Sequence, residues 1–414
     1  MTQLAVEAAI SGAPSRWRRT RLRSVAARRE DRVGARALAL LSLESVGRLV
    51  PRLPDRQAPA ESNIPRYLEV SHGDLVINPM WLTGGSIAVS DRVGAVSPDY
   101  RVFLLTGNVD PRFIHHLLRS VPYLEQYKLF ARADTTFDRR IQQRDIDNLA
   151  LALPSLAEQR RIAEFLDGQV SRVDALIAAR RRQVELVEEL RRGQLEVITG
   201  GAEAESAGGV RLATIATKIG SGKTPRGGGD VYASSGVAFL RSQNIHNDGL
   251  RLEDVVYIDP EIDAAMSSTR VRQGDILLNI TGGSLGRCCV ATPEALPANV
   301  SQHVCIVRVP RHDPEYIAAS LQSPRILQSI RMHQAGGNRE GLNFERVGSL
   351  TIFLPRDEVS SVRAIRAANA EALQAKSTLE ESAKRLTEYK DSLITAAVTG
   401  EFDVTSTSGR SIPT

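Results

Sequence analysis

Residues 220–224, Gly-Ser-Gly-Lys-Thr, match the end of a phosphate-binding loop and are one of two patterns that could carry chemistry. The complete loop needs a further glycine where this chain has Thr217, and a helix beginning at Lys223 whose backbone amides surround the phosphate. Pro225 and a run of glycines follow instead, and they would break such a helix. The sequence therefore disfavours nucleotide hydrolysis and predicts a flexible basic loop that is solvated or touches a DNA phosphate.

The second pattern is Asn-Pro-Met-Trp at residues 78–81, which partly matches the loop with which amino-methyltransferases hold a flipped base. The second proline of that loop is missing, and no glycine-rich cofactor loop of the Rossmann type follows a strand elsewhere. The corresponding residues 279–282, Asn-Ile-Thr-Gly, have neither proline nor aromatic ring. The sequence favours a strand-to-loop exit, with Trp81 packed or exposed, over a catalytic site.

Other candidate groups also lack the spacing that catalysis or metal binding needs. His115 and His116 are adjacent, so they point to different faces of a helix, and no acidic cluster has the arrangement of a nuclease. The three cysteines suit neither a zinc knuckle nor a disulfide framework, and we expect small buried side chains in a reducing compartment. The sequence predicts a protein that is not itself an enzyme and binds no cofactor or metal of its own.

Charge and length set wider bounds. The 414 residues suggest two to three domains, and the net charge of +5 excludes neither DNA binding nor an ordinary basic enzyme. Residues 1–153 carry a net charge of +6, whereas residues 202–354 are neutral. No apolar run approaches the 18 residues of a membrane span, and the first ten residues lack the basic start of a secretory signal. We expect a cytoplasmic protein that does not enter a membrane.

The chain contains an internal repeat. His-Gly-Asp-Leu-Val-Ile-Asn at residues 72–78 recurs as Gln-Gly-Asp-Ile-Leu-Leu-Asn at 273–279, and the segments 149–154 and 350–355 share the same offset of 201. Thr-Gly at 199–200 recurs at 399–400. Each copy begins with short β-branched runs, such as 74–78, 237–240, 275–280 and 304–309, and helical stretches near 112–118 and 314–332. These patterns predict two copies of an α/β or α+β domain related by a pseudo-twofold repeat.

Each copy ends in a long helix. Ser155 and Glu158 form a capping pattern at the start of the first, in which apolar residues recur every three to four positions at Ile162, Leu166, Val170, Val173, Ile177, Val184, Val187 and Leu190. The second follows Pro355 with a spacing near 3.5, at Val362, Ile365, Ala372, Leu379, Ala383, Leu386 and Leu393, and Asn369 and Lys376 lie on its seam. Helices of about 42 residues would extend roughly 63 Å. We expect an antiparallel coiled-coil pair, with two independent helices as the alternative.

These patterns predict five segments: a first domain at 1–153, a long helix at 154–201, a second domain at 202–354, a second helix at 355–401 and a flexible tail at 402–414. Arg, Gln and Asn carry the donors and acceptors that read base edges in the major groove, and basic side chains contact phosphates. The candidate DNA-binding residues are therefore the polar, basic and aromatic residues of the predicted loops and of the basic N-terminal segment: Arg18, Arg19, Arg21, Ser42, Trp81, Thr83, Lys223, Thr224, Arg226, Arg241, Gln243, Asn244, Thr281, Ser284, Arg287, Asn338 and Arg339.

Several motifs together point to one family. Pro154 opens Pro-Ser-Leu-Ala-Glu-Gln-Arg-Arg-Ile, which leads into a helix ending Val-Ile-Thr-Gly at Gly200, and the second helix ends Leu-Ile-Thr-Ala-Ala-Val-Thr-Gly at Gly400. Gly-Lys-Thr-Pro at 222–225, Phe-Leu-Arg-Ser-Gln-Asn-Ile at 239–245 and Gly-Asp-Ile-Leu at 274–277 add to this pattern. Over nearly its whole length the chain resembles the DNA specificity subunit of type I restriction–modification systems. One departure is the start of the second helix, Pro-Arg-Asp-Glu-Val, which lacks the Glu-Gln pair of the first.

The resemblance implies a non-catalytic subunit that binds double-stranded DNA, with each domain reading one part of a bipartite site and the paired helices acting as a spacer. It also implies two docked methyltransferase subunits and separate restriction subunits, which would hold S-adenosylmethionine, ATP and magnesium. A spacer of about 63 Å allows at most roughly 18 base steps of 3.4 Å. Two alternatives stay open: a coiled-coil interaction protein with two domains for other ligands, and a nucleotide-dependent enzyme using residues 220–224.

Overall fold

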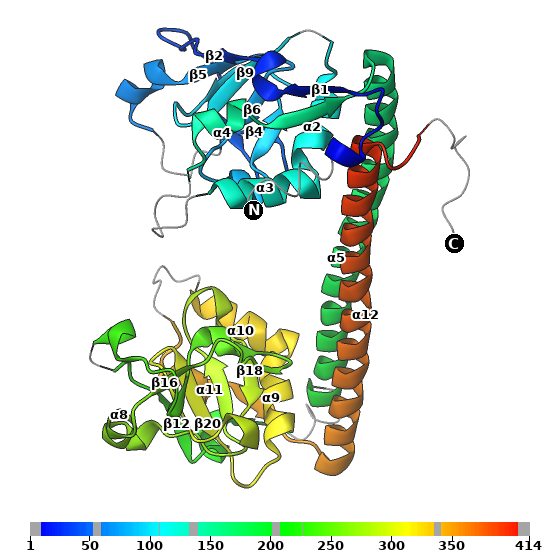
Figure 1. Cartoon of the computed structure of the whole chain (residues 1–414). Helices are drawn as coiled ribbons and strands as arrows, with labels where there is room; N and C mark the ends of the chain where they lie inside the picture. Colours follow the sequence, from blue (N-terminus) through cyan, green and yellow to red (C-terminus); the bar gives the residue numbers. More distant parts are fainter. Residues whose placement is uncertain are drawn as a thin grey trace. The chain divides into compact units, whose positions relative to one another are not determined.

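The computed structural model describes residues 10–52, 59–106, 108–131, 140–200, 208–225, 227–334 and 341–404 (Figure 1). They divide into two compact units. Unit 1 lies within Met1–Ala179 and Ser382–Thr414, and unit 2 within Arg180–Glu381. Each unit therefore contains one mixed domain and a part of each long helix.

Unit 1 contains short strands, short 3-10 helices (η) and small α-helices before the first long helix. In chain order these are β1 (Arg18–Arg21), η1 (Leu22–Ser24), β2 (Ala26–Arg29), β3 (Leu41–Leu43), β4 (Leu49–Pro51), η2 (Glu61–Arg66), β5 (Leu68–Val70), β6 (Leu75–Ile77), η3 (Leu82–Gly84), β7 (Ile87–Val89), β8 (Gly94–Val96), β9 (Arg101–Leu105), α2 (Pro111–Arg119), α3 (Val121–Phe130), α4 (Gln143–Asp147), β10 (Ala150–Leu153) and the start of α5 (Leu156–Gly200).

Unit 2 repeats this plan and ends in the second long helix. Its elements are β11 (Gly209–Arg211), α7 (Leu212–Ile215), β12 (Lys218–Ser221), η4 (Gly228–Val231), β13 (Val237–Leu240), η5 (Ser242–Asn244), β14 (Ile245–His246), β15 (Gly249–Leu250), β16 (Val256–Ile258), α8 (Pro260–Ala265), η6 (Ser267–Thr269), β17 (Ile276–Asn279), η7 (Gly282–Ser284), β18 (Cys288–Val290), η8 (Pro293–Ala295), β19 (Ala298–Val300), β20 (Val304–Arg308), α9 (Pro314–Gln322), α10 (Pro324–Gln334), α11 (Phe344–Ser349), β21 (Thr351–Phe353) and α12 (Glu358–Thr399).

The largest sheet has the same topology in the two units. A four-stranded antiparallel sheet has the order β2-β9-β6-β7 in unit 1 and β12-β20-β17-β18 in unit 2. The register also repeats, because Leu75 pairs with Val89 and Ile276 pairs with Val290, an offset of 201 at both positions. The predicted fold class, two α/β domains with two long helices, is confirmed.

The helix after each sheet begins and ends for local reasons. Asp110 and Asp313 are the N-caps of α2 and α9, where each side chain accepts a backbone N–H, and a proline follows at the first helical position. The predicted single helical stretch over 314–332 was wrong: it is two helices, α9 and α10, interrupted at Ser323. Pro324 explains the break, because it lacks a backbone N–H and disfavours helical geometry at the residue before it.

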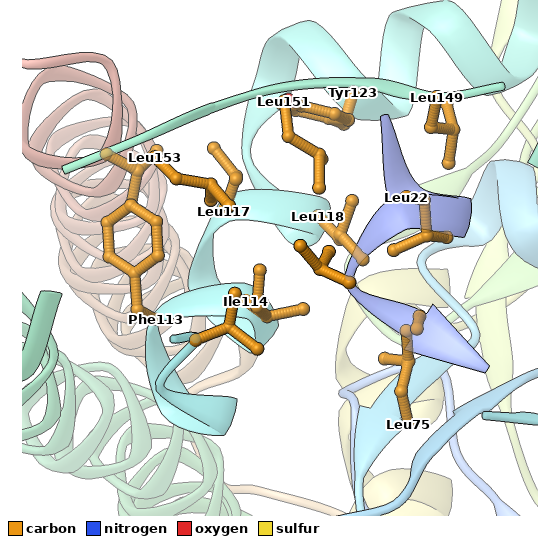
Figure 2. Packing of buried hydrophobic residues seen from close by; sticks show 14 of the residues in the cluster. Leu22, Leu75, Phe113, Ile114, Leu117, Leu118, Tyr123, Leu149, Leu151 and Leu153 are labelled. Carbon is orange, nitrogen blue, oxygen red and sulfur yellow. The ribbon is translucent and has the colours of Figure 1, made fainter. Parts of the chain in front are cut away.

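The core of unit 1 joins the domain to both long helices. Figure 2 shows α2 side chains, among them Phe113, Ile114 and Leu118, together with Leu22 and Leu151 of the neighbouring segments. The same cluster includes residues from the start of α5 and the end of α12, namely Ile162, Ala163, Leu166, Ala397 and Val398. The start of one helix therefore packs beside the end of the other, which is an antiparallel arrangement.

The long-helix seam in unit 2 shows the same pairing at the opposite helix ends. Leu195 of α5 shares a buried cluster with Val362 and Ile365 of α12, so the helices do not cap their domains independently. Leu190, predicted on the apolar stripe, is 70% exposed, and Arg191 is buried in its place. A straight helix turns every 3.6 residues, so a stripe drifts around it over such a length.

A polar contact crosses this seam at a predicted position. Arg191 donates from Nη1 to Oδ1 of Asn369 at 2.9 Å, while its other nitrogens bond Glu188. The other predicted seam residue, Lys376, instead pairs with Asp248 of the domain. Asn369 therefore lies on the seam and contacts the other helix, as the sequence predicted, whereas Lys376 ties α12 to the domain.

The start of α5 uses only half of the predicted capping box. Ser155 Oγ accepts the backbone N–H of Glu158 at 3.2 Å. The Glu158 carboxylate, however, accepts hydrogen bonds from Arg16 at 2.9 Å and from the Trp17 indole at 3.2 Å. Glu158 therefore holds the N-terminal segment of unit 1 against the helix, a role that the local motif could not reveal.

The cysteines are free and buried, as the sequence predicted. Burial raises the pKa of Cys288, Cys289 and Cys305 to about 12 each. Thiols with such values are uncharged near neutral pH, and the thiolate is the reactive form. The three side chains therefore serve as core residues of unit 2.

An acid-sensitive link joins α2 to α5 in unit 1. Asp167 accepts hydrogen bonds from His116 Nε2 at 2.8 Å and from Arg112 Nη1 at 3.1 Å. The His116 hydrogen bond lowers the pKa of Asp167; burial opposes this shift, and the charges of His116 and Arg112 add to it. Since the folded-state pKa lies below the ordinary value near 3.9, the carboxylate stabilises unit 1 above about pH 4 and loses that effect as the pH falls.

Replacing Asp167 with Asn tests this link. We expect a lower melting temperature than wild type at pH 7, and a smaller further loss between pH 5 and 3, because the titrating group is gone. Thermal unfolding followed across that pH range measures both effects. Equal acid sensitivity in the two proteins would place the acid-labile group elsewhere.

Candidate nucleic-acid interface

Most predicted site residues of unit 2 lie on neighbouring turns at the ends of β13 and β17. Asn279 ends β17 and is fully buried. Its Nδ2 donates to the Ser242 carbonyl at 2.9 Å and to Ser284 Oγ at 3.0 Å, which joins the turn after β13 to the turn after β17. The predicted Arg241, Gln243, Thr281 and Ser284 are thereby brought onto one surface.

The loop of Lys223 and Thr224 reaches the same region. Gly222 donates to the Val304 carbonyl, and a Cβ at Gly222 would lie 1.6 Å from the Val300 carbonyl oxygen, so only glycine permits this approach. Lys223 and Thr224 are exposed, and no helix begins there. This geometry differs from a phosphate-binding loop, which needs a helix at that lysine.

His303 lies among these turns but was not predicted from the sequence. Its backbone carbonyl accepts from Ile280, and its Nδ1 lies 2.8 Å from Thr281 Oγ1. The contact joins positions about twenty residues apart, and no pattern near His303 indicates it. Asn279 was also missed as a site residue, although the repeated asparagine at 78 and 279 was a usable signal.

The side chains of this surface differ in how free they are to contact a ligand such as DNA. Gln243 and Arg287 are exposed, whereas Arg241 donates to the Asp254 carbonyl and lies over the Tyr232 ring. Asn244 is buried, because its Oδ1 accepts from the Arg241 N–H and its Nδ2 donates to the Arg251 carbonyl. We assign Asn244 to the support of the turn. The predicted Arg226, Asn338 and Arg339 lie outside the described residues.

Unit 1 presents an apolar turn at the equivalent place. Trp81 is 61% exposed and Met80 is 37% exposed. The turn is nevertheless fixed, since the Trp81 carbonyl accepts from Gly84 and Ser86 and the Trp81 N–H bonds the Asn78 carbonyl. Thr83 is half-buried beside them. A ring held in this way can contact a DNA base without first ordering its backbone.

The other predicted residues of unit 1 do not join this turn. Arg18, Arg19 and Arg21 are exposed on β1, which pairs only with β10 among the described strands, and Arg21 bonds the Asn148 carbonyl. Ser42 is half-buried on β3, opposite Val50. The structure therefore places these residues on two small sheets separate from the sheet that carries Trp81.

The two turns have one scaffold and different side chains. Asn78 and Asn279 are both buried, and Gly85 and Gly286 both have positive φ, at 80° and 83°. At the offset of 201, Trp81 corresponds to Gly282 and Met80 to Thr281. The same backbone thus presents apolar groups in unit 1 and polar groups in unit 2.

A separate apolar groove runs between α5 and α12 within unit 2. It has a volume of about 840 Å³. Three large exposed side chains of α5 line it, namely Leu186, Leu190 and Val197, of which the last two are 70% and 73% exposed. Across the groove lie small residues of α12: Ala364, Ala367 and Ala368. Small residues facing large ones leave a channel of the kind into which another helix packs.

No helix in the described part of the chain is both long and apolar enough to cross a membrane. Among the same residues, no group of three or more His, Cys, Asp or Glu side chains is placed to hold a metal ion.

Comparisons with known proteins agree with this architecture. No model of a known protein family matches the chain. The specificity subunit of the Escherichia coli type I restriction enzyme EcoBI is 23% identical over 317 residues, which cover 70% of this chain and 65% of that protein, just under two thirds of its length. A solved structure concerned with complex assembly and conformational transition of the type I restriction–modification system has a TM-score of 0.66 at 18% identity and covers 94% of this chain and 99% of its own.

The HsdS subunit of Thermoanaerobacter tengcongensis also covers 94% of this chain and 98% of its own at 18% identity, with a TM-score of 0.46. The structure with the TM-score of 0.66 and this chain share a fold of duplicated α/β domains with paired long helices, and in this chain each domain carries a fixed turn with its own side chains. In sequence the chain is similar to a specificity subunit of a type I restriction–modification system, and in fold to a structure solved for such a system.

Proposed function

We propose that the chain is the non-catalytic DNA specificity subunit of a type I restriction–modification complex. Each domain reads one half of a bipartite site in double-stranded DNA, and the helix pair sets the gap. The observation that carries this proposal is the pair of equivalent turns, in which one scaffold presents Trp81 and Met80 in unit 1 and Thr281 and Gly282 in unit 2. Two readers with one backbone and different side chains suit a site whose halves differ.

The apolar groove of unit 2 supports the proposed subunit contact. Its occupant is a helix of a methyltransferase subunit, because Leu190 and Val197 project on one side and the alanines of α12 leave room on the other. We propose that the complex contains two methyltransferase subunits and separate restriction subunits. These partner subunits bind S-adenosylmethionine, ATP and magnesium.

The two tryptophans allow a direct test of DNA reading. Trp17 is 4% exposed, so a Trp17→Phe variant leaves the exposed Trp81 as the only tryptophan of this chain, and partner subunits mixed with no DNA give the background emission. We expect its fluorescence to be quenched by a duplex carrying the recognised site, in the presence of the methyltransferase subunits, and not by random duplex at the same concentration. Trp81→Ala should weaken binding of the recognised duplex roughly tenfold, since the loss of correct contact with one base pair typically costs about 1–3 kcal/mol.

Val93→Ala is the matched control, because Val93 is 55% exposed on the turn between β7 and β8 and is not part of the Trp81 turn. The recognised site is obtained by sequencing methylated bases in cells with and without the gene. Binding of random and specific duplex with equal affinity would instead favour an interaction protein with other ligands. Lys223→Ala should retain all activity, and a loss of nucleotide hydrolysis in that variant would favour the enzyme alternative.

A further inference from the structure

The two short helices that follow the four-stranded sheets, α2 in unit 1 and α9 in unit 2, each end on a polar residue. Arg119 is the last residue of α2, and Gln322 is the last residue of α9. Both helices have nine residues and an aspartate N-cap followed by proline, so the two positions are equivalent in the repeat. Their side chains differ in length and charge, and comparison of the two sequences therefore does not mark them as a pair.

Arg119 joins two loops of unit 1 through backbone carbonyls. Its Nη1 donates to Gly85 and, at 3.4 Å, to Ile87, while its Nη2 donates to Ser45 at 3.1 Å. Gly85 and Ile87 follow the Trp81 turn, and Ser45 lies in the hairpin between β3 and β4. The contact is close, since a Cβ at Gly47 of that hairpin would lie 2.6 Å from the guanidinium carbon.

Gln322 makes the same two connections in unit 2. Its Nε2 donates to the Cys288 carbonyl at 2.9 Å and to the Asn247 carbonyl at 3.0 Å. Cys288 corresponds to Ile87 at the offset of 201, and Asn247 lies in the hairpin between β14 and β15. Two different side chains thus hold the strand after the reading turn to a hairpin tip.

In unit 2 the hairpin is also tied to a long helix. Asp248, next to Asn247, pairs with Lys376 of α12 at 3.4 Å, and Asn247 Oδ1 accepts the Cys288 N–H at 3.1 Å. A continuous set of hydrogen bonds therefore runs from α12 through the hairpin to Cys288, directly after the turn that carries Thr281, Ser284 and Arg287. Within the described part of α9, Gln322 is the side chain that bonds the carbonyls of both Asn247 and Cys288.

The turn after β6, which carries Trp81, and the turn after β17, which carries Thr281, are called the reading turns of the two units. We propose that Arg119 and Gln322 are equivalent positioning residues, each of which fixes the reading turn of its own unit against the neighbouring hairpin. The expected effect on DNA rests on the proposed function. Loss of either residue lowers sequence discrimination at one half-site and leaves discrimination at the other half-site unchanged. In this role each residue acts through backbone carbonyls of its own unit and not through DNA.

The repeat supplies the matched variants. Arg119→Met and Gln322→Met remove the donors while keeping an unbranched side chain. Arg119→Gln and Gln322→Arg give each unit the residue of the other, and a cavity of about 350 Å³ lined by Gln322 leaves room for the longer arginine. Arg119→Gln and Gln322→Arg should both keep the turn fixed and the half-site recognised, because each residue type already joins the turn to the hairpin in the other unit.

Hydrogen exchange on the full-length chain tests the structural part without DNA. In Gln322→Met we expect peptides covering 245–250 and 282–290 to exchange up to roughly 30-fold faster, since two hydrogen bonds that contribute about 1 kcal/mol each are lost. In Arg119→Met the peptides are 44–48 and 82–89. Unchanged exchange in the methionine variants, or equal acceleration in Arg119→Gln and Arg119→Met, would overturn the proposal.

Selection from a random 30-base-pair duplex library, with the methyltransferase subunits present, tests the functional part. We expect Gln322→Met to lose roughly tenfold in discrimination at the half-site of unit 2 alone, within the range of a single mismatched base pair. Arg119→Met should affect only the other half. Equal loss at both halves, or no loss despite faster exchange, would refute the positioning role. If wild type enriches no sequence, the proposed function fails, and the exchange result still decides whether these residues fix the turns.

Discussion

Insertion of seven residues into both α5 and α12, after Ala179 and after Glu381, should lengthen the gap of the recognised site by about three base pairs. Seven residues add roughly 10.5 Å of helix, and each base step spans about 3.4 Å. A heptad preserves the apolar seam, so the helices can still pair. The insertion points lie at the boundary between the units, so neither domain is interrupted. Both half-sites should be unchanged, because no residue of either reading turn is altered.

Sequencing of methylated bases in cells that carry the altered gene measures the gap and the half-sites together. An insertion into α5 alone is the control, because it shifts the two halves of the seam against each other and should abolish methylation. A changed half-site with an unchanged gap would show that the helices do not set the spacing.

Replacement of both Leu190 and Val197 with Glu should abolish docking of a methyltransferase subunit on unit 2. Two charges in an apolar groove oppose burial of a partner helix, and central interface residues often contribute 2 kcal/mol or more, which corresponds to at least roughly 30-fold in affinity. The chain itself should fold normally, because both side chains are largely exposed. Size-exclusion chromatography and calorimetry of the mixed subunits measure the effect.

Val359→Glu provides the matched control for the groove. Val359 is 70% exposed on α12 but does not line the groove, so the same charge should have little effect there. Docking that survives both groove substitutions would place the methyltransferase contact on another surface.

The large elements of this protein could be predicted from its sequence because they depend on local patterns and on the repeat. The offset of 201 predicted two equivalent domains, and the capping serine and apolar stripe predicted α5. The precise stripe could not be predicted over such a length, which is why Arg191 rather than Leu190 is buried. A helix break at Pro324 was predictable from proline chemistry but was overlooked.

The site was harder to predict, since its supports connect distant residues. Arg119 and Ser45 are 74 positions apart, and Asn279 and Ser242 are 37 apart. A basic cluster such as Arg18, Arg19 and Arg21 is visible in sequence, but whether it joins the reading turn depends on strand pairing. Burial likewise decided that Asn244 supports its turn, because an asparagine suits a base edge and a backbone carbonyl equally well.

The division into units has a consequence for synthesis on the ribosome. Unit 2 is one contiguous segment, Arg180–Glu381, whereas unit 1 combines an early segment with one made after unit 2. Ile162 and Leu166 of α5 share their core with Ala397 and Val398, so this apolar surface stays uncovered until α12 is complete. We expect unit 2 to finish folding first, and nascent chains stalled before residue 382 to bind chaperones through the uncovered face of α5.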